Sequence, residues 1–159
     1  MAEAVGVSAL IVADLGQRRT KDYEWAWDRA LSDSGDTGVK LQYTHARLTS
    51  LLEKCVEQDT ELDTSLGDLL TESIAVELVW VISRYDEVLA SSYSTLEAVT
   101  MVKFLFQLCN TTSKALKLLP VKNAETRGLA AARIKLFAAA RLTLADGMTV
   151  LGIRPLDRI

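Results

Sequence analysis

Five residues between positions 40 and 54 have types and spacings that suit contact with a nucleic acid. Their spacings are 3, 4, 3 and 4, which place all five on one face of an α-helix. Basic side chains can neutralise phosphates, and a tyrosine ring can stack on an unpaired base. No acidic residue belongs to this first stripe, which consists of Lys40, Tyr43, Arg47, Ser50 and Lys54.

A second stripe of the same kind lies between positions 103 and 117, again without an acidic member. An exposed helix ordinarily mixes both signs, because Glu–Lys pairs four residues apart stabilise it. A stripe of one sign therefore favours phosphate neutralisation, and a solvated helix face is the alternative. The members of this second stripe, spaced 4, 3, 4 and 3, are Lys103, Gln107, Asn110, Lys114 and Lys117.

A third group combines an aromatic ring with two cations near the end of the chain. Arg133, Phe137 and Arg141 recur every four residues and so share one helix face. An aromatic between two arginines could stack on a base. The alternative is that Phe137 belongs to the core and the arginines only flank it.

The charge is distributed unevenly along the chain, although the net charge is only −3. Residues 1–100 contain 8 Lys and Arg against 18 Asp and Glu, whereas residues 101–159 contain 10 against 3. A basic face with a polyanionic partner is one interpretation. Two solvated surfaces of opposite sign that attract each other are the other.

The stretch GDTG at positions 35–38 is not a phosphate-binding loop, because no GK[ST] follows it and no strand precedes it. Asp36 or Thr37 is expected to cap the next helix with its side chain. The only histidine, His45, falls on or beside the apolar stripe of that helix and has no catalytic partner at a recognisable spacing. We therefore expect it to be packed and hydrogen-bonded.

The elements that must position these residues are helices, because the chain has only two prolines and its apolar residues repeat at helical intervals. We expect a single all-α domain over residues 1–159, a bundle of about five to six helices. Pro120 should end the long helix, and Asp146–Gly147 should end the last one. The connections are expected at 22–31, which is rich in aromatics, and at 57–65, which is acidic. The expected helices cover 3–15, 38–56, 66–82, 85–93, 96–119 and 129–146.

The remaining composition excludes several classes of protein. No apolar run approaches the roughly 18 residues of a bilayer span, so no membrane partner is expected. Cys55 and Cys109 stand too far apart for a metal-binding spacing and are expected to be reduced thiols, without a metal site. The long helix carries a mostly apolar stripe that should face the core: Val102, Leu105, Cys109, Thr112, Leu116 and Leu119.

Several stretches of this sequence resemble one family over nearly the whole chain. GDTGVKLQYTHARLTSLL resembles the signature that opens the C-terminal, DALR-type anticodon-binding domain of arginyl-tRNA synthetases. LFQLCNTTSKALKLLPV is similar to the family's long helix that ends in Pro-Val. The final AAARIKLFAAARLTLADGMTVLGIRPLDRI resembles the family's terminal pattern and is the longest and most specific match.

This resemblance implies that the full enzyme attaches arginine to tRNA-Arg with ATP and Mg²⁺, and that this chain grips the anticodon stem-loop. The catalytic nucleotide-binding domain, with its HIGH-like and KMSK-like motifs, is absent from these 159 residues. The chain alone should therefore be inactive, hold no cofactor, and act beside the enzyme's own catalytic domain. A stand-alone tRNA-binding or protein-interaction module is the alternative.

Departures from the family pattern refine these expectations. Val39–Lys40 replaces the family's Pro-Tyr and looks most like animal mitochondrial members, which suggests the mitochondrial matrix, with the cytoplasm as the alternative. The family's stacking Tyr falls near Leu116, and its terminal Met is Ile159. The residues expected to bind tRNA are Lys40, Tyr43, Arg47, Lys54, Lys103, Lys114, Lys117, Arg133, Phe137 and Arg141.

Overall fold

The computed structural model describes residues 1–32, 35–55 and 64–159, and these residues form helices and no strand. Six helices have eleven residues or more, and α2 is a single turn, so the expected all-α bundle is confirmed. Most of the connection expected at 57–65 lies outside the described residues. The elements are α1 (Ala2–Leu15), α2 (Trp27–Ala30), α3 (Gly38–Glu53), the 3₁₀ helix η1 (Thr64–Leu69), α4 (Ser73–Ser83), α5 (Tyr85–Thr95), α6 (Ala98–Leu118) and α7 (Arg127–Val150).

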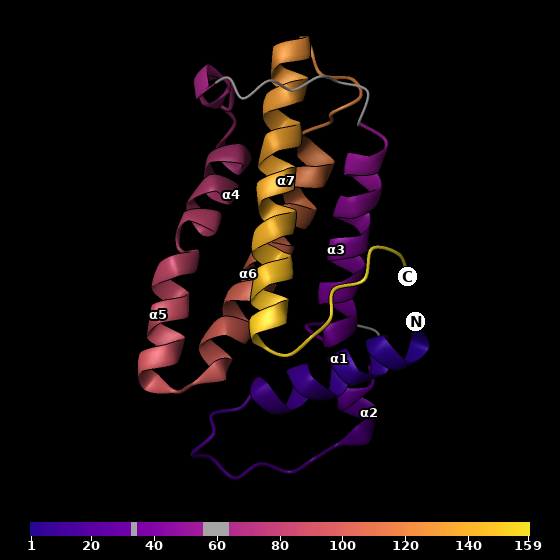
Figure 1. Ribbon diagram of the computed structural model, residues 1–159, viewed down its shortest axis with the longest axis vertical. Helices are drawn as coiled ribbons and strands as arrows, with labels where there is room; N and C mark the ends of the chain where they lie inside the picture. The colour runs from indigo at the N-terminus through magenta and orange to yellow at the C-terminus, as the bar shows by residue number, and fades with distance from the viewer. Residues whose placement is uncertain (33–34, 56–63) are drawn as a thin grey trace.

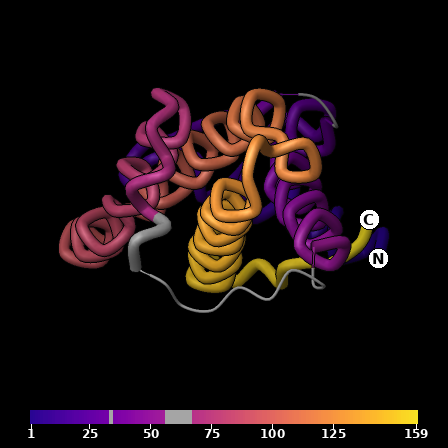
Figure 2. The backbone as a smooth tube through the Cα atoms, turned by 90° about the horizontal axis from the view of Figure 1, so that it is seen from above, coloured from indigo at the N-terminus to yellow at the C-terminus, as the bar shows by residue number. Residues whose placement is uncertain are grey.

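α7 is flanked by α3 on one side and by α4 on the other, and α5 continues from α4 and packs against α6 (Figures 1 and 2). α6 packs behind α7, and α1 crosses the end of α3 at the base of the bundle (Figure 1). The last residues leave α7 and return along α3, so both chain termini lie on the same side (Figure 1). In the described part of the chain, no helix is long and apolar enough to cross a membrane.

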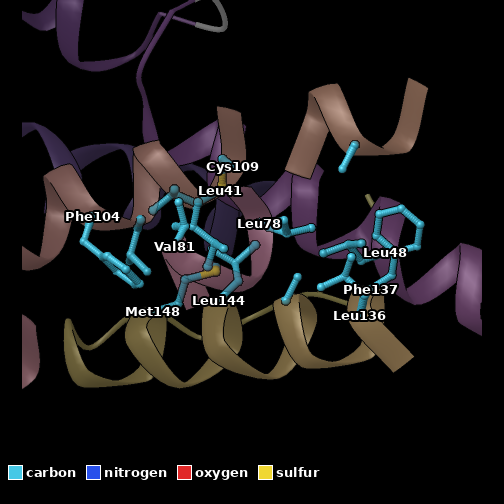
Figure 3. Packing of buried hydrophobic residues seen from close by; sticks show 14 of the residues in the cluster. Leu41, Leu48, Leu78, Val81, Phe104, Cys109, Leu136, Phe137, Leu144 and Met148 are labelled. Carbon is cyan, nitrogen blue, oxygen red and sulfur yellow. The ribbon is translucent and has the colours of Figure 1, made fainter. Parts of the chain in front are cut away.

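The core forms where α6 meets α7, α3 and α4, as its apolar stripe predicted. Five members of that stripe are buried and Leu116 is partly buried. Burying one such large apolar side chain contributes about 1.5–3 kcal/mol, so this stripe is a principal source of stability. Figure 3 shows its partners from the other helices, which include Leu41, Leu48, Leu78, Phe137, Leu144 and Met148.

The end of α6 follows the sequence prediction. Leu118 is the last helical residue, and Leu119 is already extended at φ −114° and ψ 75°. The ring of Pro120 excludes helical geometry from the residue before it, which explains this boundary.

The end of α7 corrects the prediction, because the helix continues through Gly147 to Val150. A Cβ atom at Gly147 would lie 2.6 Å from Leu105 Cδ2, so this glycine allows α6 and α7 to pack closely. The glycine that ends the helix is Gly152, at φ +78°. Its amide donates to the Thr149 carbonyl at 2.9 Å, and the Ile153 amide donates to the Met148 carbonyl at 2.9 Å.

The predicted helix at 66–82 is also wrong at its start. Residues 64–69 form η1, and α4 begins only at Ser73, after Glu72 adopts an extended conformation with ψ 137°. The break predicted near Arg84 is confirmed, because α4 ends at Ser83 and α5 begins at Tyr85.

The entrance to α3 differs from the predicted side-chain cap. Thr37 has the extended N-cap conformation, but its hydroxyl makes no capping bond. The Asp36 carboxylate instead pairs with Lys40 Nζ at 2.6 Å. Gly35 has φ +83°, as a tight turn requires, whereas Gly38 is needed for a different reason. A Cβ atom at Gly38 would lie 2.2 Å from the Ser8 carbonyl oxygen, where α1 crosses α3.

We expect Gly38→Ala to destabilise the protein, because the added methyl group must displace the backbone of α1. The expected loss in the free energy of unfolding is about 1–3 kcal/mol, measured by urea denaturation. Gly6→Ala is the matched control within α1, since a Cβ atom there meets nothing within 4 Å. The control should be neutral or stabilising by up to about 1 kcal/mol. Equal effects of the two changes would contradict the close contact at Gly38.

Candidate nucleic-acid interface

A groove of about 570 Å³ runs between α3 and the C-terminal tail, residues 153–159. Four of the five first-stripe residues line it: Tyr43, Arg47, Ser50 and Lys54. Tyr43 is 56% exposed, as a residue that offers its ring for stacking must be. Arg47 and Lys54 are exposed and have no ion pair within the described residues. The structure therefore gathers most of this stripe around one hollow.

The far wall of the groove comes from parts of the chain that are distant in sequence. Leu116 of α6 and the tail residues Asp157, Arg158 and Ile159 complete the lining. The Arg158 guanidinium lies 3.5 Å from the Glu53 carboxylate but is largely exposed, so it adds a cation to the rim. Sequence reasoning did not single out Asp157 or Arg158, because nothing local to the tail shows that it folds back onto α3.

The tail is held in place by two buried polar side chains of α3. Gln42, wholly buried, donates from Nε2 to the Arg154 carbonyl at 2.8 Å and accepts at Oε1 from the Leu156 amide at 2.9 Å. His45 Nδ1 lies 2.9 Å from the Leu156 carbonyl oxygen, which can only accept, so this nitrogen carries the proton. The packed, hydrogen-bonded His45 is thus confirmed, and Gln42 is a structural residue that the stripes did not reveal.

Lys40 joins the two basic stripes instead of standing free. Its Nζ donates to Asp36 Oδ1 and to Asn110 Oδ1, each at 2.6 Å. Since Asn110 belongs to the second stripe, this contact places α3 and α6 side by side on the same face. The Asp36 carboxylate offsets the charge of Lys40, so its attraction for phosphate is weaker than that of Arg47.

The second stripe is exposed along α6, as expected, but it is not surrounded by basic residues alone. Lys103, Lys114 and Asn110 line a shallow hollow that also contains Glu77 of α4. The Glu77 carboxylate accepts from Thr111 Oγ1 at 3.5 Å. The helical spacing of α6 could not reveal this acid, because it is contributed by a neighbouring helix. Lys117, one turn beyond Lys114, is exposed.

The third group does not form a binding surface, and its prediction is wrong for two of the three residues. Phe137 has no exposed surface, so its ring cannot stack on a base. Arg133 is buried and paired with the Glu72 carboxylate, and its Nη1 donates to the Pro120 carbonyl at 2.7 Å. The hydrogen bond from Arg133 lowers the pKa of Glu72 from its ordinary value. Arg141 is half-buried on the same helix.

Neither cysteine has a disulfide partner in the described part of the chain. Burial raises the pKa of the Cys109 thiol to about 12, so this group stays protonated at neutral pH. Among residues 1–32, 35–55 and 64–159, no three His, Cys, Asp or Glu side chains gather closely enough to hold a metal ion. The groove itself is lined by charged, aromatic, hydroxyl and apolar side chains.

Comparison with known proteins gives a consistent result. Residues 41–159 match the DALR anticodon binding domain family. A probable cytoplasmic arginine–tRNA ligase of Dictyostelium discoideum is 40% identical to this chain. The alignment covers 100% of this chain and 26% of the ligase. A probable mitochondrial arginine–tRNA ligase of Mus musculus is 41% identical to this chain. The alignment covers 99% of this chain and 27% of the ligase. This chain thus spans about a quarter of the length of these relatives.

Solved structures show the same fold. The arginyl-tRNA synthetase of Thermus thermophilus superposes with a TM-score of 0.88 at 23% identity, covering 99% of this chain and 27% of that one. The arginyl-tRNA synthetase of Plasmodium falciparum gives 0.85 at 22% identity, covering 99% of this chain and 28% of that one. At these identities the likeness concerns the fold alone.

We expect Phe137→Ala to reduce the free energy of unfolding by about 3–5 kcal/mol, because it leaves a cavity at the centre of the core. Tyr43→Ala removes an aromatic ring of similar size from the exposed groove and should change stability by no more than about 0.5 kcal/mol. Thermal and urea denaturation of the two variants check both values. A small effect at Phe137 would contradict its place in the core.

Proposed function

Because the chain belongs to the DALR anticodon-binding domain family, in the form found in arginine–tRNA ligases, we propose that its groove holds the anticodon stem-loop of tRNA-Arg. The observation that carries this proposal is the convergence of Tyr43, Arg47 and Lys54 on one open groove. An exposed ring beside unpaired cations is what an unstacked loop base and its phosphates require.

The residues of the groove divide between two tasks. Arg47 and Lys54 neutralise phosphates and so set the register of the RNA, together with Lys114 and Lys117 on α6. Lys103 extends the same basic face toward the base of the bundle. Lys40 joins α3 to this face through its hydrogen bond to Asn110. Tyr43 offers its ring to an unstacked base. The Asp157 carboxylate, on the opposite wall, can accept hydrogen bonds from the edge of that base.

Leu116 and Ile159 give the groove an apolar component that phosphate binding alone does not need. Both line the same groove as Tyr43. An apolar surface next to an aromatic ring favours the flat face of a base over its solvated edge. This mixture supports recognition of an open loop over recognition of a continuous duplex.

The activity of the whole enzyme rests on the remaining three quarters of the protein, judged by the length of the relatives. In the proposed scheme that remainder binds ATP and Mg²⁺ and charges the tRNA, while this chain places the anticodon arm beside it. The chain alone should not activate arginine. The stand-alone module is not favoured, since the matching relatives are ligases over the full extent of this chain.

The compartment forms a separate part of the proposal. The relatives include both cytoplasmic and mitochondrial ligases, so either compartment fits the family. The support for the mitochondrial matrix is the pair Val39–Lys40 in the signature stretch.

We expect Arg47→Ala to weaken binding of a tRNA-Arg transcript and to reduce the slope of log K against log salt by about 0.7–0.9, because one phosphate contact is lost. Arg84→Ala is the matched control. Arg84 lies at the junction of α4 and α5 (Figure 1), does not line the groove, and pairs with Glu87 at 3.6 Å, although it shares a separate hollow with Lys103. Filter binding at several salt concentrations measures both variants. If Arg47→Ala changes neither affinity nor slope, the groove is not the tRNA site.

We expect the isolated chain to form no arginyl-tRNA when it is supplied with arginine, ATP and tRNA-Arg. The reason is the absence of the HIGH-like and KMSK-like motifs from the sequence. A charging assay with labelled arginine provides the measurement, and a complete arginine–tRNA ligase provides the positive control. Charging above the enzyme-free background would overturn this part of the proposal.

A further inference from the structure

A second cavity, of about 220 Å³, lies where α1, α2 and α6 meet, and it shares no lining residue with the groove. The hollow exists because the surrounding helices contribute small residues to it, namely Ala9, Ala13, Gly16 and Ala30. The chain between α1 and α2 passes over it and contributes Trp25. This cavity therefore lies partly beneath the aromatic connection.

The size of the cavity limits what it can take. Sites for drug-sized ligands occupy roughly 300–1,000 Å³, so a volume of about 220 Å³ suits a single ring system. One wall is apolar, with Val12 and Val102, and Phe106 and Trp25 add aromatic surface. Such walls favour a flat, weakly hydrated group over a sugar or a free ion.

The rim of the cavity carries polar groups that a purely apolar ligand would leave unused. Arg29 and Lys103 supply two cations, and neither has an ion pair among the described residues. The Asp36 carboxylate also lines the cavity, but Lys40 pairs with it and offsets its charge. The Thr37 hydroxyl is buried there without a hydrogen-bond partner. A ligand with a flat ring, hydrogen-bonding edges and an attached negative charge would satisfy the two cations and the hydroxyl.

We propose that this cavity receives one unstacked nucleotide of the same RNA, with its base beside Trp25 and its phosphate between Arg29 and Lys103; this rests on the proposed tRNA function. Lys103 connects the cavity with the hollow on α6 that contains Lys114, because it lines both. Lys114 lies eleven positions after Lys103 on α6, or roughly 17 Å along the helix axis. A strand that follows α6 from the groove thus arrives at the mouth of the cavity.

The test compares substitutions of two neighbouring tryptophans in the 159-residue chain. Trp25 lines the cavity, whereas Trp27, in contact with it at 5.4 Å between ring centres, does not. We expect Trp25→Ala to weaken binding of a tRNA-Arg transcript about tenfold, as loss of one stacked base does, and Trp27→Ala to weaken it less than twofold. Ala13→Leu, which fills the cavity from α1, should weaken binding to a similar extent as Trp25→Ala.

A second readout follows the ring directly. In a Trp27→Phe, Trp80→Phe background the fluorescence of Trp25 should be quenched when the transcript binds. Melting temperatures of all variants separate loss of binding from loss of folding. A Trp25→Ala variant that melts earlier but binds RNA as the parent does would show a purely structural ring and overturn the proposal.

The two proposals fail in different ways. If Arg47→Ala weakens binding while Trp25→Ala and Ala13→Leu do not, the groove stands and the cavity takes no nucleotide. If Arg47→Ala also binds as the parent does, the proposed tRNA function itself is wrong.

Discussion

The burial of α6 is the constraint on which the rest of the structure depends. Its apolar stripe faces a core shared with α3, α4, α5 and α7, and its polar stripe lies on the exposed side of the helix. Gly147 shows how closely α6 and α7 approach, because a Cβ atom there would lie 2.6 Å from Leu105 Cδ2 and that side chain would have to shift. The orientation of Lys103 and Lys114 toward solvent is therefore a consequence of packing in the core.

The groove depends indirectly on the packing of α6, because α3, which lines the groove, rests against it. α3 rests against α6 and α7, and the Lys40–Asn110 contact fixes the two polar faces side by side. Arg133 holds the start of α4 and the loop after α6 through Glu72 and Pro120. These contacts set the position of the last turn of α6, from which Leu116 reaches the groove. A buried ion pair thus supports an exposed surface without being part of it.

The sequence predicted most of the helices and the shared face of the first stripe, because the helical repeat can be read from spacings of three and four residues within one segment. It could not decide between Tyr43 and Phe137, since each has a cation about one helical turn away on either side and only the neighbouring helices determine which ring is covered. The same limit explains Glu77, which comes from another helix, and Gly147, whose neighbours in sequence look like a helix end. The folding back of the tail onto Gln42 depends on contacts more than a hundred residues apart.

Gln42 and His45 hold the C-terminal tail through its main chain, so the hydrogen bonds that position the tail do not depend on which side chains it carries. Both side chains contact main-chain amide and carbonyl groups, which every residue except proline supplies in full. The side chains at Asp157, Arg158 and Ile159 take no part in these bonds, which hold the backbone at Arg154 and Leu156. The contacts of Asp157 with Thr49 and of Arg158 with Glu53 are exposed. One wall of the groove can in this way acquire a new chemical preference by single substitutions, at little cost to the fold.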